Sequence, residues 1–224
     1  MDTLLFNFFN IDILDKYGVY LLKGLGQTAL LSAIAIPVGS IVGLGIALLS
    51  THSRRIVRLL MVVYTDLFRA FPPLVLLILI NAGLPHVGIR LPALGSITLA
   101  LLLNSSSYYG EIFRAGLLSV PRGVEEASRA TGLSWLQTAF FVRLPIAVRN
   151  VLPDLLSNTL ELVKLTSIAA VVTFVELTQA ARVVQGLTFN ATPIIAAALL
   201  YFIILWPLAR LVSRLERRTL VSRR

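Results

Sequence analysis

Long intervals with few charged residues constrain this chain more than any other feature of its sequence. Apolar residues make up 57% of its 224 residues and charged residues only 14%, which is too hydrophobic for a soluble domain of this length. A helix of roughly 20 mainly apolar residues crosses the hydrocarbon core of a bilayer with all its backbone groups hydrogen-bonded. The composition therefore predicts an all-α integral membrane protein, and the absence of a low-complexity linker predicts one transmembrane bundle.

Five intervals are long enough to form membrane-spanning helices. They cover about residues 20–49, 57–84, 91–113, 152–175 and 193–215. The second interval is interrupted by the pair Pro72-Pro73. We expect an N-terminal segment over residues 1–19 outside the membrane, a transmembrane domain over 20–216, and a basic cytoplasmic tail over 217–224.

Lysine and arginine gather on one side of the predicted bundle. They cluster in residues 54–58, 114–149 and 210–224. With five spans, these three segments all fall on the same side of the membrane. The segments on the opposite side contain only Lys16, Lys23, Arg90 and Arg182. Because basic loops stay cytoplasmic, the N-terminus is predicted outside and the C-terminus inside. The net charge of +9 is thus a topology signal. A nucleic-acid-binding surface would instead interleave basic and aromatic residues on a soluble face.

Several chemistries find no support in the sequence. The chain has no cysteine for disulfides or thiolate metal sites, and His52 and His86 fall in apparent connecting loops rather than in a ligand-spaced cluster. No G-x-x-x-x-G-K-[ST] loop is present, so we expect this chain to bind no nucleotide. Residues 1–23 carry acidic side chains and lack the pattern of a cleaved signal peptide. The first span is expected to serve as its own insertion signal.

The polar interval at about residues 116–148 separates the third and fourth spans on the cytoplasmic side. Residues 120–130 alternate apolar and charged positions after Pro121, which predicts a short helix entered at a proline. Gly132 is expected to end it, since glycine adopts the left-handed conformation without a Cβ penalty. A water-exposed loop of this length in a membrane protein usually docks a partner.

A second short helix is predicted within the same interval. Ser134 is a suitable N-cap with Gln137 in capping-box position, and we expect this helix to end before Pro145. The loop then forms a helix–turn–helix at the cytoplasmic surface. The alternative is an amphipathic connector that only rests in the headgroup layer.

The loop residues carry a family resemblance. Their spacing is E-A-[AS]-x3-G-x9-[IV]-x-L-P, formed by Glu126, Ala127, Ser128, Gly132, Val142, Leu144 and Pro145. This pattern resembles the EAA loop of binding-protein-dependent ABC importer permeases, with serine in place of the second alanine and valine in place of isoleucine. Three further runs, at residues 68–72, 106–116 and 164–168, resemble segments of the polar-amino-acid subfamily. Leu165 departs from the acidic residue usual there, so any substrate contact carried over to it is in doubt.

The resemblance implies a type I importer fold and a division of labour. The six residues of the loop expected to couple the chain to a cytoplasmic ATPase are Glu126, Ala127, Ser128, Gly132, Leu144 and Pro145. ATP and Mg²⁺ would be bound by two such ATPase subunits. A periplasmic binding protein would deliver a polar amino acid or a related compound, and a second permease, identical or paralogous, would complete the pathway in the bacterial inner membrane.

Polar groups at membrane depth are the candidates for the substrate path. They are Asp66, Arg69, Ser106, Ser107, Tyr108, Glu161, Lys164, Thr166 and Ser167. The Asp-Arg and Glu-Lys pairs are three residues apart on one helical face, so they either neutralise each other or meet the two charges of a zwitterion. The hydroxyls either donate to a substrate carboxylate or satisfy backbone carbonyls one turn back. Tyr108 either lines the path or belongs to the interfacial aromatic belt.

Two functions from other classes remain open on the residues alone. A secondary transporter or channel would also bury charge pairs, although it normally shows internal repeats that five spans with one such loop do not provide. An intramembrane enzyme could use Glu161 and Lys164 as acid and base, but no nucleophile with a recognisable spacing accompanies them.

Overall fold

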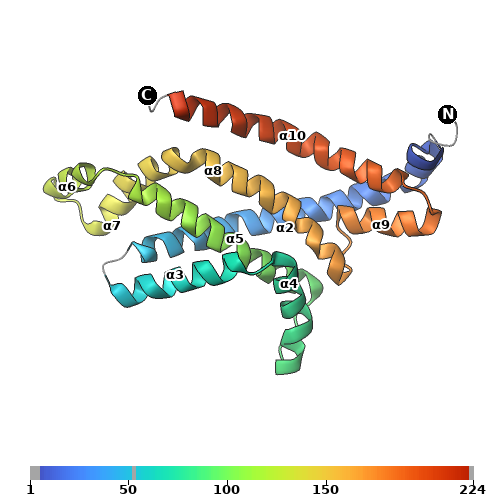
Figure 1. The fold of residues 1–224 in the computed structure, drawn as a ribbon, viewed down its shortest axis with the longest axis horizontal. Helices are drawn as coiled ribbons and strands as arrows, with labels where there is room; N and C mark the ends of the chain where they lie inside the picture. The colour runs from blue at the N-terminus through green and yellow to red at the C-terminus, as the bar shows by residue number, and fades with distance from the viewer. Residues whose placement is uncertain (1–5, 52–53, 222–224) are drawn as a thin grey trace. The chain divides into compact units, whose positions relative to one another are not determined.

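The structure of the chain is a computed structural model that describes residues 6–51 and 54–221, and in this part of the chain all regular secondary structure is helical (Figure 1). The α-helices are α2 (Ile11–Ser50), α3 (Arg55–Ala70), α4 (Pro73–Ile78), α5 (Ala93–Leu118), α6 (Arg122–Ala130), α7 (Trp135–Gln137), α8 (Leu144–Leu165), α9 (Leu177–Thr188) and α10 (Thr192–Val221). The wider π-helical stretches are η1 (Leu79–Gly83) and η3 (Thr138–Arg143), and the tighter 3-10 stretches are η2 (Leu84–Val87) and η4 (Thr166–Val172). His52 and the end of the predicted basic tail, residues 222–224, lie outside the described residues.

The chain forms two compact units. Unit 1 comprises Met1–Ile36, Pro72–Leu101 and Leu160–Arg210, and unit 2 comprises Pro37–Phe71, Leu102–Thr159 and Leu211–Arg224.

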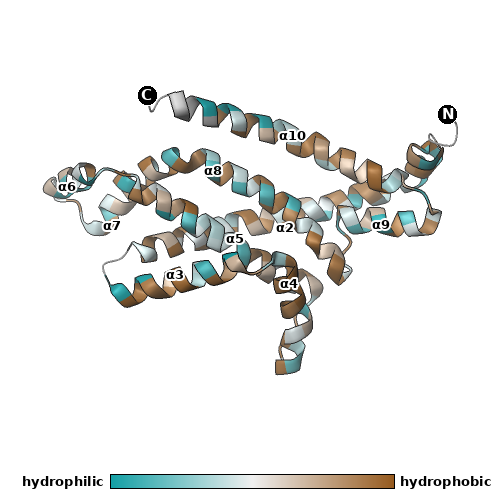
Figure 2. Cartoon of the chain, viewed as in Figure 1, coloured by the Kyte–Doolittle hydropathy of each residue, from teal (hydrophilic) through white to brown (hydrophobic). Residues whose placement is uncertain are grey.

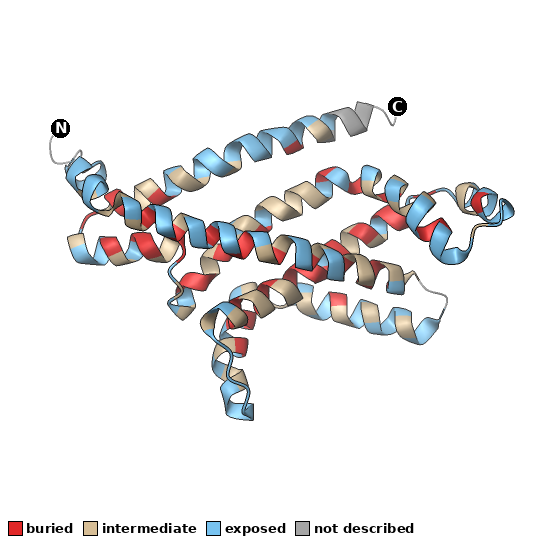
Figure 3. Cartoon of the chain, turned by 180° about the vertical axis from the view of Figure 1, so that it is seen from behind, coloured by how far each residue is buried: buried red, intermediate tan, exposed pale blue. Residues whose placement is uncertain are grey.

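Unit 1 is built around a core of small and aliphatic side chains. Leu21 of α2 packs with Leu177, Ala180 and Ala181 of α9 and with Ala197 of α10. Figure 3 shows buried residues concentrated along α9, whereas α10 is largely exposed. The alanines allow close approach of helix backbones, which is how helices associate where lipid removes the hydrophobic driving force.

Unit 2 brings the C-terminal part of α5 against α2. A Cβ added at Gly43 would lie 2.6 Å from the Cβ of Tyr109 and 2.8 Å from the backbone nitrogen of Gly110, so only glycine permits this contact. Tyr109 is buried, and its hydroxyl lies 2.8 Å from that of Thr159. Buried tyrosine hydroxyls need such a partner, since an unpaired one costs free energy.

Length and composition identify three helices of the described residues that can cross a membrane, at Phe6–Ser50, Trp135–Val172 and Thr192–Leu215. A fourth is obtained if Arg55–Ala70 and Pro73–Val87 count as one bent span. Figure 2 shows the hydrophobic residues of α10 giving way to hydrophilic ones toward its C-terminal end. The remaining predicted span is α5, which has 26 residues but carries a run of four consecutive polar residues, Asn104, Ser105, Ser106 and Ser107. All four are buried within the protein, so they do not require contact with lipid.

Two predicted spans fall largely within longer helices. The predicted span 20–49 is part of α2, which begins at Ile11, and most of the predicted span 152–175 lies in the helical run Trp135–Val172. The second span is two helices, because Pro73 has no N–H and the residue before a proline disfavours helix. Phe71 and Pro72 are accordingly extended, with ψ of 128° and 126°.

Close packing of α2 on α9 gives a direct test of the fold of unit 1. A Cβ added at Gly24 would lie 2.8 Å from the Cβ of Ala180, whereas one added at Gly26 meets nothing within 4 Å. Both Gly→Ala changes gain the same helix propensity, so their difference isolates the clash. We expect Gly24→Ala to be less stable than Gly26→Ala by about 1–3 kcal/mol, measured by thermal unfolding in detergent. Equal stability of the two variants would contradict this packing.

Candidate functional site

The first short helix of the cytoplasmic loop is α6, and both of its predicted ends are confirmed. Pro121 is the N-cap in an extended conformation, and the helix ends at Ala130. Gly132 has φ of +88°, in the left-handed region, and its backbone nitrogen donates to the carbonyl of Arg129 at 3.0 Å. The glycine thus reverses the chain without strain, as the sequence indicated.

The second helix has the predicted start but not the predicted end. The Ser134 hydroxyl accepts from the backbone nitrogen of Gln137 at 3.3 Å, and the Gln137 side chain accepts from the nitrogen of Ser134 at 2.8 Å, which completes the capping box. The helix does not stop before Pro145 but runs on from Trp135 to Val172. The prediction failed because η3 widens the turn just before the proline, and a wider turn relieves the clash between a proline ring and the carbonyl four residues earlier.

Ser128, which stands where the family pattern has alanine, joins the two short helices. It is buried, donates to the carbonyl of Glu125 at 2.8 Å and contacts the hydroxyl of Thr138 in η3 at 3.4 Å. A second link is the ion pair between Glu125 and Arg143, at 3.3 Å. These contacts fix α6 against η3, so the loop is a defined helix–turn–helix rather than a loose connector.

Glu126 and Ala127 point away from these contacts. Both are exposed, and Glu126 is in no hydrogen bond or ion pair among the described residues. Leu144 is half-buried and Pro145 is exposed. The neighbouring helical stretch also exposes Leu136, Phe140 and Phe141, the last with 74% of its surface accessible. A free carboxylate beside exposed apolar side chains is a composition typical of a docking surface.

Five of the substrate-path candidates lie in unit 2, and their two charged members do not pair among the described residues. Asp66 and Arg69 form no ion pair in the described residues; the Arg69 guanidinium instead lies 5.2 Å from the centre of the Tyr108 ring. Ser106 and Ser107 are buried and donate to carbonyls three residues back, at 3.3 and 2.6 Å. Ser106 also lies 2.8 Å from the hydroxyl of Tyr64. The backbone-satisfying interpretation of these two hydroxyls is therefore confirmed.

Asp66 and Arg69 share a small cavity with charges that the sequence analysis did not select. The cavity, of about 150 Å³, is also lined by Glu111 and Arg114. Arg114 donates to Glu111 through its Nε at 2.9 Å. The sequence could have identified these two residues as candidates, because both belong to the run at 106–116 that carried the family resemblance. Two acids and two bases thus surround one site in unit 2.

The other four candidates lie in unit 1. Lys164 and Glu161 form the expected ion pair at 2.6 Å, on a largely exposed face of α8. Thr166 is buried and donates to the carbonyl of Val163 at 2.7 Å, so its hydroxyl satisfies the backbone. Ser167 is half-buried in η4. Of this group, the charged pair is the most exposed.

Glu176 is a buried carboxylate that the sequence analysis missed. It is the N-cap of α9, with no exposed surface, and accepts from the backbone nitrogens of Thr178 and Gln179 at 2.8 Å. The Tyr201 hydroxyl donates to it at 3.1 Å and that of Thr28 at 3.5 Å. Neutral donors at the N-terminal end of α9 thus satisfy both oxygens of this side chain. Its position just before a helical run was the available signal.

Comparison with known proteins identifies the family. The family described as binding-protein-dependent transport system inner membrane component matches residues 35–221. The chain belongs to this family. It is 34% identical to the probable amino-acid ABC transporter permease YckA of Bacillus subtilis over 88% of this chain and 87% of that protein. It is 32% identical to the probable glutamine ABC transporter permease GlnM of the same organism over 93% of this chain and 97% of that protein.

Solved structures of ABC transporters are also similar to this chain. The chain is 34% identical to a solved chain of an amino acid ABC transporter with histidines. The TM-score between the two is 0.81, over 92% of this chain and 96% of that one. The MetNI methionine ABC transporter, at 22% identity, shares the fold, with a TM-score of 0.73 over 89% and 96% of the two chains. The predicted all-α membrane fold of type I importers is therefore confirmed. The permease is the membrane-spanning transport subunit, and its family works with an ATPase and a substrate-binding protein. Family membership sets aside the secondary transporter and the intramembrane enzyme.

Proposed function

We propose that the permease moves a polar amino acid or a close relative inward from a periplasmic binding protein across the bacterial inner membrane. The observation that carries this substrate class is the kinship to permeases named for amino acids and for glutamine. Charges of both signs support it, because a zwitterion needs an acid for its ammonium and a base for its carboxylate. The cavity lined by Asp66, Arg69, Glu111 and Arg114 offers both in unit 2, and Glu161 with Lys164 offers both in unit 1.

The assembly has a second permease and two ATPase subunits. The strongly apolar, exposed side chains of α10 are suited to lipid or to another permease, and they include Leu199, Phe202, Ile203 and Trp206. ATP and Mg²⁺ bind to the ATPase subunits, since this sequence has no phosphate-binding loop of the G-x-x-x-x-G-K-[ST] type. Nucleotide-driven closure of the ATPase pair then switches a midplane site between the two faces of the membrane.

The loop transmits this closure. Glu126 supplies the charge for docking, and Ala127 is small enough for close helix contact with the ATPase. Ser128, the ion pair of Glu125 with Arg143, and Gly132 hold α6 in place. Because Leu144 and Pro145 lie within the helix that runs from Trp135 to Val172, a displacement of the loop acts on that span as a rigid lever.

The substrate is tested with the complete complex in proteoliposomes. ATPase activity is measured with the cognate binding protein loaded in turn with each common amino acid. Stimulation by one polar amino acid, with uptake of the same radiolabelled compound, is the expected result. Stimulation only by a compound of another class would contradict the amino-acid assignment while leaving the permease family intact.

Reversal of the charge at Glu126 tests the coupling role. Glu126→Lys is expected to reduce stimulated ATPase activity and uptake by more than about tenfold, because like charges at a docking contact cost several kcal/mol. Gly132→Arg should act similarly, since its left-handed φ disfavours any side chain. Asp15→Lys, an equally exposed reversal at the far end of α2, is the matched control. Normal transport by an inserted Glu126→Lys variant would refute the coupling role.

The absence of native cysteine makes the orientation testable by labelling. Single cysteines replace Leu136 in the loop and Leu187 in α9, which have 58% and 65% of their surface exposed. A membrane-impermeant maleimide added to spheroplasts is expected to label the variant at 187 and to label the variant at 136 only after permeabilisation. The reverse pattern would show that the N-terminus is cytoplasmic.

A further inference from the structure

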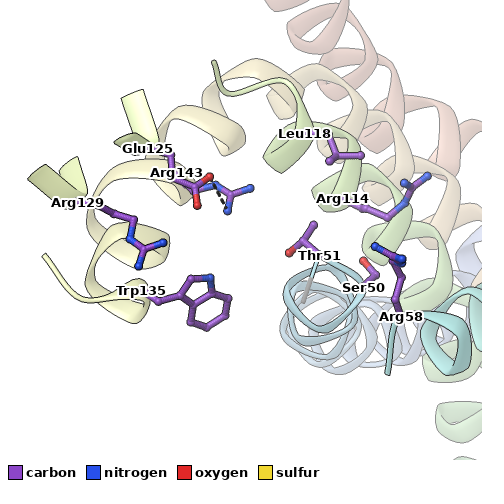
Figure 4. A pocket seen from close by; sticks show the side chains of 9 residues that line it. All are labelled: Ser50, Thr51, Arg58, Arg114, Leu118, Glu125, Arg129, Trp135 and Arg143. Carbon is purple, nitrogen blue, oxygen red and sulfur yellow. Dashed lines mark ion pairs between the residues drawn. The ribbon is translucent and has the colours of Figure 1, made fainter. Parts of the chain in front are cut away.

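A second and larger cavity lies in unit 2 and shares Ser50 and Arg114 with the charged cavity already described. It has a volume of about 620 Å³, and Figure 4 shows the nine side chains around it. They are Ser50, Thr51, Arg58, Arg114, Leu118, Glu125, Arg129, Trp135 and Arg143. The lining includes neither Glu126 nor Ala127, the exposed residues assigned above to ATPase docking.

The cavity carries a surplus of positive charge. Four of its lining residues are arginines and only Glu125 is acidic. Arg143 pairs with Glu125, and Arg114 pairs with Glu111, which lies outside this lining. The guanidinium groups of Arg58 and Arg129 have no hydrogen-bonded or ionic partner among the described residues. In Figure 4 Arg129 and Trp135 lie on one side of the cavity, and Arg58 and Arg114 lie on the other. The space between them is suited to an anion.

The position of the lining residues along their helices indicates the depth of the cavity in the membrane. Ser50 is the last residue of α2, Leu118 is the last of α5, and Arg58 lies in the first turn of α3. The cavity is therefore at the end of the apolar spans, on the side where the basic loops place the cytoplasm. This is the level of the phospholipid headgroups, where basic pockets between helices attract anionic lipids.

We propose that this cavity binds the phosphate group of an anionic phospholipid of the cytoplasmic leaflet. Guanidinium groups form bidentate hydrogen bonds with phosphate oxygens, and Arg58 and Arg129 are free to do so. The Ser50 and Thr51 hydroxyls already donate to the carbonyls of Ala47 and Leu48, at 2.8 and 2.9 Å, so the guanidinium groups are the donors that the cavity offers to phosphate. Leu59 and Leu118, with 60% and 62% of their surface exposed, offer apolar contact to the acyl chains. Trp135 is a typical interfacial residue.

The test uses the permease purified in detergent together with its ATPase subunits. Native mass spectrometry measures retention of phosphatidylglycerol against phosphatidylcholine. The wild-type complex is expected to retain phosphatidylglycerol preferentially, and Arg58→Gln or Arg129→Gln to weaken its retention about fivefold each, the factor for one arginine near an anionic surface. Arg55→Gln removes the same charge from the same helix at a position that does not line the cavity, and it should leave retention unchanged.

The other outcomes overturn the proposal in distinguishable ways. Equal loss in Arg55→Gln and Arg58→Gln would mean that the lipid responds to general surface charge rather than to the cavity. Displacement of the lipid by millimolar inorganic phosphate would make the ligand a free anion. Loss of the ATPase subunits from Arg58→Gln with lipid retention intact would assign the cavity to the ATPase contact. None of these readouts depends on which substrate is transported, so the result is independent of the proposed function.

Discussion

The close approach of backbones to α2 is the constraint on which both units depend. In unit 1 the backbone at Gly24 meets α9, and in unit 2 the backbones at Gly39 and Gly43 meet α5, so closely that a Cβ at any of these positions would lie 2.8 Å or less from another atom. Lipid tails are as apolar as leucine, so the hydrophobic effect does not hold membrane helices together; dispersion contacts and hydrogen bonds do. Glycine lowers helix propensity in water, but here it permits the contacts that define each unit.

Tight packing also decides where polar groups can be buried. Glu176 accepts two backbone hydrogen bonds at the start of α9, and Ser106 and Ser107 return their hydroxyls to the backbone of α5. Each group is satisfied locally, which removes the cost of an unpaired polar atom away from water. The ion pair of Glu161 with Lys164 differs from these groups, because both of its side chains are largely exposed. Burial with internal partners therefore separates structural polar residues from candidate substrate contacts.

Local signals predicted the cytoplasmic loop well because its conformation is decided by neighbours in sequence. The left-handed Gly132 and the capping box of Ser134 with Gln137 both depend on residues within one turn. Pro145 was misread because its tolerance depends on the π-helical turn before it, which no residue pattern revealed. The spacing of Asp66 and Arg69 allowed them to neutralise each other, yet the Arg69 guanidinium lies over the Tyr108 ring of α5 instead. Spacing within one helix does not reveal contacts between two helices, so the contact of Arg69 with Tyr108 could not be predicted from it.

In the proposed coupling role, rigidity of the loop is what makes a docking contact useful for transport. A flexible connector would absorb the motion of a partner, whereas α6 is tied to η3 by Ser128 and by the ion pair of Glu125 with Arg143. The helical run that follows continues from Trp135 to Val172. Serine in place of the family's alanine strengthens this link, because its hydroxyl adds a contact with Thr138 that a methyl group cannot make.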